Sequence, residues 1–283
     1  MQQHQSILSY QRGRYLKLAL LLCIGSIAAY AWHQPPTASL KPYGGTYLGY
    51  TLGTIGAALI VWLMLLGVRK RRYRSAIGTL QGWTSAHVYL GVSLLVVVTL
   101  HCAFEFGWNI HTLAYALMVA VIVSGFFGIY AYLSYPEMIT RNMASDTVEE
   151  LLPKVAELDR KCRRLALDLP DEMNEVVTRA SRAMERDISE TSRFSLARIN
   201  RPHATAIACE KLKTLGAKLP ADQARLNGEL LKEMSRKRLL IDRLRRDVRY
   251  RTLLQLWLYA HVPLSFALLA ALLAHVVSVF YYW

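Results

Sequence analysis

The chain has 283 residues, of which 53% are hydrophobic, yet its formal net charge is +14. Soluble proteins rarely combine so much apolar side chain with so much charge, and here the two are segregated along the sequence. Nucleic-acid binding is disfavoured because the basic residues are interleaved with acidic ones on predicted helices. The composition instead favours a membrane protein with one charged region.

Charge-free runs occur at about 18–32, 46–67, 83–104, 112–134 and 253–283. Each approaches or exceeds the ~20 residues that a helix needs to cross a bilayer. Most of the charged residues lie between the last two runs, in residues 135–252. We therefore expect an all-α membrane protein with four transmembrane helices in residues 1–134, a helical cytoplasmic insertion over 135–252 and a fifth transmembrane helix in 253–283. The first run also has the features of a cleaved signal peptide, but we treat it as a retained helix.

Basic residues predict the orientation of these helices. Apart from Lys41, the Lys and Arg residues, 33 of 34, lie at 12–17, at 69–74 and within 135–252. The positive-inside rule makes that side cytoplasmic, which places the N-terminus inside and Trp283 in the periplasm. We expect a multi-pass protein of the inner membrane whose basic segments contact anionic lipid.

The insertion is predicted to be helical because apolar residues recur at helical spacing between mixed charges. Thr147 or Asp146 can cap a first helix that Pro170 ends, and further helices are expected at about 171–188 and 203–216. From about residue 221 one long helix can continue into the fifth transmembrane run. The sequence has no dinucleotide-binding glycine motif, P-loop or C-x-x-C pair, so the insertion is most simply a docking or spacing module.

Four histidines lie within the predicted transmembrane helices and form two pairs. His87 and His101 are fourteen residues apart in the third run, as are His261 and His275 in the fifth. Fourteen steps of ~100° end about 40° short of four turns, so both members of a pair face nearly the same way, roughly 21 Å apart along the axis. Both runs are predicted to begin on the cytoplasmic side. His87 can therefore meet His261 at one depth, and His101 can meet His275 at the other.

Two imidazoles at each of two depths are what two bis-histidine haems require. His87 and His261 would bind the cytoplasmic-side iron, and His101 and His275 the periplasmic-side iron. A zinc site would need three or four ligands converging on one point. The alternative is that these histidines are hydrogen-bonded packing residues, which requires the two equal spacings to be accidental.

This pattern resembles the di-haem b-type cytochromes: the cytochrome b of quinol–cytochrome c oxidoreductases, the ferric-reductase-like transmembrane proteins and the small membrane cytochromes b. In those families, two helices of a four-helix bundle each carry two histidines about thirteen or fourteen residues apart. The resemblance covers the second to fifth transmembrane runs but not the insertion, and it does not select one subfamily. It implies a di-haem four-helix bundle with two non-covalent b-type haems.

Other residues are candidate contacts of the haems or of a quinol. Glycine gives room for a porphyrin face, or else for close helix packing, and the candidates are Gly53, Gly67 and Gly125. Cations near helix ends can bind haem propionates, and the candidates are Arg72, Arg251 and Lys41. Glu105, the only acid near the outer membrane face, is the candidate base for a quinol. His111 is expected at the membrane interface, where it needs no special role or could accept a proton from a quinol or bind a propionate.

These residues lead to the hypothesis of a membrane cytochrome b that passes electrons across the inner membrane between a quinone or partner redox subunit and the opposite side. Because no donor domain is present, we expect an electron-transfer subunit of a larger oxidoreductase. Its partner would be a periplasmic cytochrome or iron–sulfur protein, or a cytoplasmic donor that docks on 135–252. The alternatives are a stand-alone quinol-dependent reductase of iron or oxygen species, and a haem-free membrane scaffold or sensor.

Overall fold

The computed structural model describes residues 7–33, 44–72, 78–143, 147–189 and 202–282, and within these ranges the regular structure is entirely helical. Five helices are long and apolar enough to cross a membrane by length and composition. They are α1 (Arg14–Trp32), α2 (Tyr47–Arg71), α3 (Leu80–His101), α4 (Ile110–Met143) and α9 (Ala221–Tyr282). The chain is an all-α, multi-pass membrane protein, as its hydropathy predicts.

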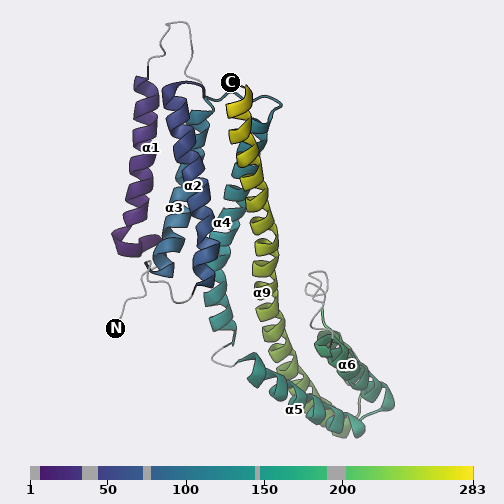
Figure 1. The fold of residues 1–283 in the computed structure, drawn as a ribbon. Helices are drawn as coiled ribbons and strands as arrows, with labels where there is room; N and C mark the ends of the chain where they lie inside the picture. The colour runs from purple at the N-terminus through teal and green to yellow at the C-terminus, as the bar shows by residue number, and fades with distance from the viewer. Residues whose placement is uncertain (1–6, 34–43, 73–77, 144–146, 190–201, 283) are drawn as a thin grey trace. The chain divides into compact units, whose positions relative to one another are not determined.

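Two compact units make up the chain. The transmembrane unit comprises Met1–Tyr130 and Trp257–Trp283, and the polar unit comprises Ala131–Leu256. In the transmembrane unit a short 3-10 segment, η1 (Ile7–Arg12), precedes α1, and α3 packs against both α1 and α2. One apolar core takes residues from all five helices: Ala19, Ile60, Leu63, Ala86, Leu90, Leu94, Met118 and Leu268. Figure 1 shows α1 to α4 and the yellow end of α9 side by side in this unit.

The helices α2 and α3 begin in the same way. The hydroxyl of Thr46 accepts a hydrogen bond from the backbone N–H of Gly49, and that of Thr79 accepts one from Gly82, both at 3.1 Å. Such caps satisfy a backbone donor that the first turn leaves without a helical partner. The cap on α2 fixes the position of Gly49, whose carbonyl contacts one of the histidines.

The polar unit packs α5 (Val148–Leu167), α6 (Asp171–Ser189), α8 (Ala204–Gly216) and the first part of α9 around a second core. A capping box between Thr147 and Glu150 begins α5, and Pro170 lies immediately before α6. The core includes residues from each of these helices, among them Cys162, Val177, Cys209, Leu212, Leu230 and Met234. The helix boundaries predicted from apolar spacing in this region are confirmed to within about two residues.

This unit also buries charged side chains. Lys237 of α9 has no exposed surface and pairs with Asp159 of α5, which is 1% exposed. The same carboxylate accepts a hydrogen bond from Ser181 at 2.6 Å and pairs with Arg163 at 3.0 Å. A buried lysine is tolerated only when its charge is paired, so this contact is expected to fix α9 against α5.

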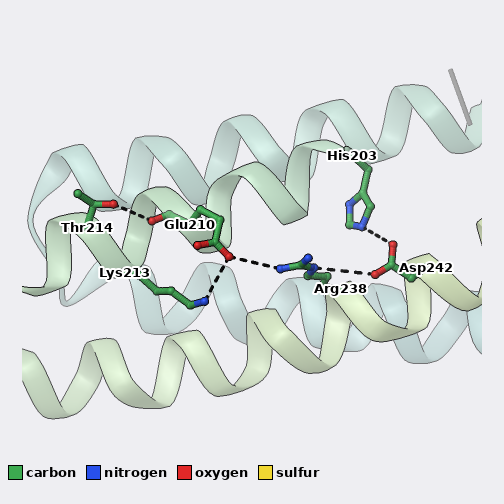
Figure 2. Close-up of polar contacts among 6 residues, drawn as sticks. All are labelled: His203, Glu210, Lys213, Thr214, Arg238 and Asp242. Atoms are coloured by element: carbon green, nitrogen blue, oxygen red, sulfur yellow. Dashed lines mark hydrogen bonds and ion pairs between the residues drawn. The ribbon is translucent and has the colours of Figure 1, made fainter. Parts of the chain in front are cut away.

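A second polar network joins α8 to α9 (Figure 2). Nε2 of His203, at the start of α8, lies 3.2 Å from Oδ1 of Asp242. Arg238 lies between Asp242, at 3.9 Å, and Glu210, at 3.5 Å. The last two contacts are largely solvent-exposed and contribute at most about 1 kcal/mol each, whereas His203 is buried.

Candidate functional site

Two pairs of histidines lie between α3 and α9. The ring centres of His101 and His275 are 6.1 Å apart, with the ring planes at 78° to each other. His87 bonds to α2 and His261 to α4, and the charge of a protonated His261 would act on His87. We call these pairs the His101 level and the His87 level. Each level takes one half-buried histidine from each helix, so α3 and α9 run in the same direction through the unit.

Backbone carbonyls of α2 hold both histidines of α3. Nδ1 of His87 lies 3.1 Å from the carbonyl oxygen of Leu63, and Nδ1 of His101 lies 2.8 Å from that of Gly49. The two carbonyls are fourteen residues apart, like the two histidines, because α2 and α3 run antiparallel with matched turns. A carbonyl can only accept a hydrogen bond, so both imidazoles carry a proton on Nδ1.

Side chains of α4 hold both histidines of α9. The hydroxyl of Ser124 lies 2.6 Å from Nδ1 of His261, and it donates its own proton to the carbonyl of Val121 at 2.8 Å. Ser124 is therefore an acceptor for His261. At the other level Nδ1 of His111 contacts Nδ1 of His275, with ring centres 4.4 Å apart and planes at 87°. Ser124 and His111 are thirteen residues apart on α4, which runs antiparallel to α9 in this unit.

All four histidines thus form their hydrogen bonds through Nδ1. Their Nε2 atoms have no hydrogen-bond partner within the described ranges of the chain. A neutral imidazole protonated on Nδ1 keeps its lone pair on Nε2, where it can bind a metal. Metal-binding histidines almost always donate their other ring N–H to such an acceptor. In this arrangement Nδ1 of each of the four histidines is engaged, and Nε2 keeps a lone pair that can accept a bond.

The spacing of the His101 level fits a metal ion between the two rings. An ion held by two imidazole nitrogens at about 2 Å from each separates the ring centres by roughly 6 Å. The observed separation of 6.1 Å matches that value. Among the described residues there is no group of three or more His, Cys, Asp or Glu side chains arranged to hold a metal ion. The His87 level holds two imidazoles, and the His101 level holds those of His101 and His275, with His111 beside His275.

The three predicted glycines occupy different surroundings. A Cβ added to Gly53 would lie 2.7 Å from Cε1 of His101, so the ring depends on the missing side chain for its position. A Cβ on Gly125 would lie 3.9 Å from Cε1 of His261, an ordinary contact distance. Gly67 has no atom within 4 Å of that position and faces open space. Gly53 and Gly125 therefore border the histidine rings. Gly67, on the same helix as Gly53, has no side chain of the described residues within 4 Å of its added Cβ.

An indole packs beside the His87 level. The ring of Trp257 lies 5.2 Å from that of His261, and its Nε1–H donates to the carbonyl of Ser124 at 2.8 Å. A Cβ on Gly128 would come within 2.1 Å of this indole, so only glycine allows the close approach of α4 and α9 here. Ser124 consequently accepts hydrogen bonds from two residues of α9, through its hydroxyl and through its carbonyl.

The predicted charged residues that the structure describes do not contact the histidines. Arg72 is exposed at the end of α2, and Glu105 is exposed in the segment after α3. Arg251 pairs with Asp247 at 2.8 Å in the polar unit. Arg72, Glu105 and Arg251 form no hydrogen bond or ion pair with a histidine in the described part of the chain, and Lys41 lies outside the described residues.

Sequence reasoning missed the residues that support the histidines. The carbonyls of Gly49 and Leu63 leave no signal in the sequence, because every residue has one. Ser124 and His111 do leave a signal, since their spacing of thirteen repeats that of the histidines to within one residue. Lys70 was also missed, although it interacts electrostatically with both histidines of the His87 level.

Comparison with known proteins finds no relative. No model of a known protein family, no curated protein and no solved structure matches this chain. The resemblance to di-haem cytochromes therefore stays a prediction, and the function has to be inferred from the two histidine levels themselves.

Proposed function

We propose that this chain is a di-haem b-type membrane cytochrome that passes electrons across the bilayer. The observation that carries the proposal is the set of four histidines at two matched levels, each bonded through Nδ1 and open at Nε2. A bis-histidine haem supplies one-electron iron chemistry, whose potential the protein tunes through the ligands and their surroundings. His87 and His261 would hold one iron, and His101 and His275 the other.

The helices contribute spacing and a low dielectric. Fourteen residues of helix separate the two levels by roughly 21 Å, which is most of a ~30 Å hydrocarbon core. Lys70 supplies a positive charge near the His87 level and lies one turn beyond Gly67, on the same face of α2. It joins Arg72 and Arg251 as a candidate cation for a haem carboxylate.

The distribution of basic residues supports an orientation. With 33 of 34 Lys and Arg residues assigned to one side, the N-terminus and the polar unit face the cytoplasm of a cell whose inner membrane holds the protein. The His87 level is then the cytoplasmic-side level. Because the chain has no flavin, nicotinamide or iron–sulfur motif, it acts as an electron-transfer subunit that exchanges electrons with a quinone or with partner redox subunits.

The test is the haem content of the purified chain from haem-replete cells. A reduced-minus-oxidised spectrum with a pyridine haemochrome assay should give about two b-type haems per chain. His101→Ala and His87→Ala should each leave about one, and the control His203→Ala, in the polar unit, should leave two. A colourless wild-type preparation would contradict the proposal and favour a haem-free membrane scaffold or sensor.

A further inference from the structure

We infer that His111 is a positioning residue for His275: it accepts the Nδ1–H of His275 and so fixes the tautomer and ring orientation in which that histidine offers Nε2. The inference rests on the proposed function, because it concerns how one of the four ligands is held. From the sequence, His111 is expected at the membrane interface, either without a special role or as a contact of a quinol or a propionate.

The contact between the two rings requires a donor and an acceptor. Nδ1 of His111 and Nδ1 of His275 meet directly, and the rings approach edge to face at 4.4 Å. Two neutral imidazole nitrogens in contact can share only one proton, so one of them carries it and the other accepts. No carboxylate bonds to either ring in the described part of the chain, so neither ring has an alternative acidic partner.

The contacts of the other three histidines indicate which of the two rings donates the proton. Leu63 and Gly49 accept from His87 and His101 through carbonyls, which have no proton to give. On α4, Ser124 gives its own proton to a carbonyl and so also accepts, from His261. His111 occupies the place on α4 that corresponds to Ser124, thirteen residues earlier and opposite the other histidine of α9.

If His111 were the donor, His275 could no longer offer Nε2 as a ligand. If His111 donated, Nδ1 of His275 would hold the lone pair and Nε2 of His275 would carry the proton, which prevents it from binding a metal. With His275 as donor, the proton of neutral His111 is on its own Nε2. The pair then has one tautomer that is compatible with a ligand at the His101 level.

This acceptor has a measurable consequence. Accepting the Nδ1–H of a metal-bound imidazole raises the basicity of the ligating nitrogen, which favours the oxidised metal. Removing the acceptor should therefore shift the midpoint potential of the His101 level to more positive values. The potential of the His87 level should stay unchanged, because the three hydrogen bonds that support it do not involve His111.

Two substitutions of nearly equal shape separate hydrogen bonding from packing. His111→Asn places an oxygen acceptor where Nδ1 lies, and His111→Leu places a methyl group there. Potentiometry followed by visible spectroscopy on the purified chain measures both levels, and His101→Ala identifies the signal of the His87 level. We expect the Leu variant to raise the potential of the His101 level or to lose its haem, and the Asn variant to stay close to wild type.

The outcomes separate the inference from the proposed function. A wild-type chain without haem overturns both. A wild-type chain with two haems and a Leu variant with unchanged content and potentials overturns the role of His111 alone. Equal defects in the Asn and Leu variants also overturn it, because they would show that ring volume rather than the acceptor is what His275 needs.

Discussion

Replacing Gly53 by alanine tests whether the His101 ring is held where the structure places it. The added Cβ would lie 2.7 Å from Cε1 and 2.9 Å from Nδ1 of His101. Ordinary van der Waals contact begins at 3.4 Å, so the ring has to withdraw by about 0.7 Å, more than the ~0.5 Å tolerance of a ligand geometry. The withdrawal also stretches the 2.8 Å hydrogen bond to Gly49.

Under the proposed function, the free-energy cost of this substitution falls on the haem-bound state. Without a haem the ring can turn away from the new methyl group, whereas a ligating ring must stay in place. Overpacking costs about 1–3 kcal/mol and a lost hydrogen bond about 0.5–1.5 kcal/mol. Together they amount to about 1.5–4.5 kcal/mol, or roughly 10- to 2,000-fold weaker haem binding at the His101 level.

The assay is haem content and potentiometry of the purified variants. Gly53→Ala should lose most of the haem at the His101 level and keep the haem at the His87 level. The matched control is Gly25→Ala on α1, where nothing lies within 4 Å of the new Cβ, and it should keep both. A Gly53→Ala chain with two haems and wild-type potentials would refute the placement of the ring.

Three further predictions concern packing and the polar unit. Asp159→Ala leaves the fully buried Lys237 without its carboxylate, which should lower the free energy of unfolding by about 3–5 kcal/mol. Thiol labelling of the buried Cys162 should then be roughly 100- to 1,000-fold faster, or more. A double variant with Lys237→Met should recover part of the lost stability, and no recovery would show that the pair is not coupled. Burial lowers the pKa of His203 below 6.5, so the unfolded chain binds a proton that the folded chain does not. Stability against urea should therefore fall as the pH drops through about 6.5. His203→Gln should flatten this pH dependence, and an equal slope in both chains would contradict the role of His203. Gly128→Ala forces a Cβ to within 2.1 Å of the indole of Trp257 on α9 and should lower the thermal midpoint of the haem-loaded chain. An unchanged midpoint would contradict the close approach of α4 and α9 at this position.

The sequence allowed the fold to be predicted at the level of helices. Charge-free runs of sufficient length identified the five transmembrane helices. Apolar spacing, the N-cap at Thr147 and the helix break at Pro170 located the helices of the polar unit. Equal spacing of the histidines also predicted which of them share a level, since the ring contact between His101 and His275 follows from two helices that run the same way. Periodicity carries this information because it is a property of each helix by itself.

The neighbours of each histidine could not be predicted in the same way. The acceptors for His87 and His101 are backbone carbonyls, and their identity depends on how α2 is placed along α3 rather than on any side chain. That Gly53 borders a haem stays a prediction; the structure shows that it borders the His101 ring, because the smallest residue lets the imidazole approach α2. Such contacts arise from the packing of two helices, which composition and spacing within one helix do not determine.

Under the proposed function, the hydrogen-bond acceptors of the four histidines differ between the two levels. Both histidines of α3 donate to carbonyls of α2, so this side of each level is chemically the same. On α9, by contrast, one histidine donates to the hydroxyl of Ser124 and the other meets the imidazole of His111. An imidazole nitrogen is more basic than a hydroxyl oxygen, and a stronger acceptor makes the ligand more basic. A difference in potential between the levels is therefore expected to arise on α4, which itself carries none of the four histidines.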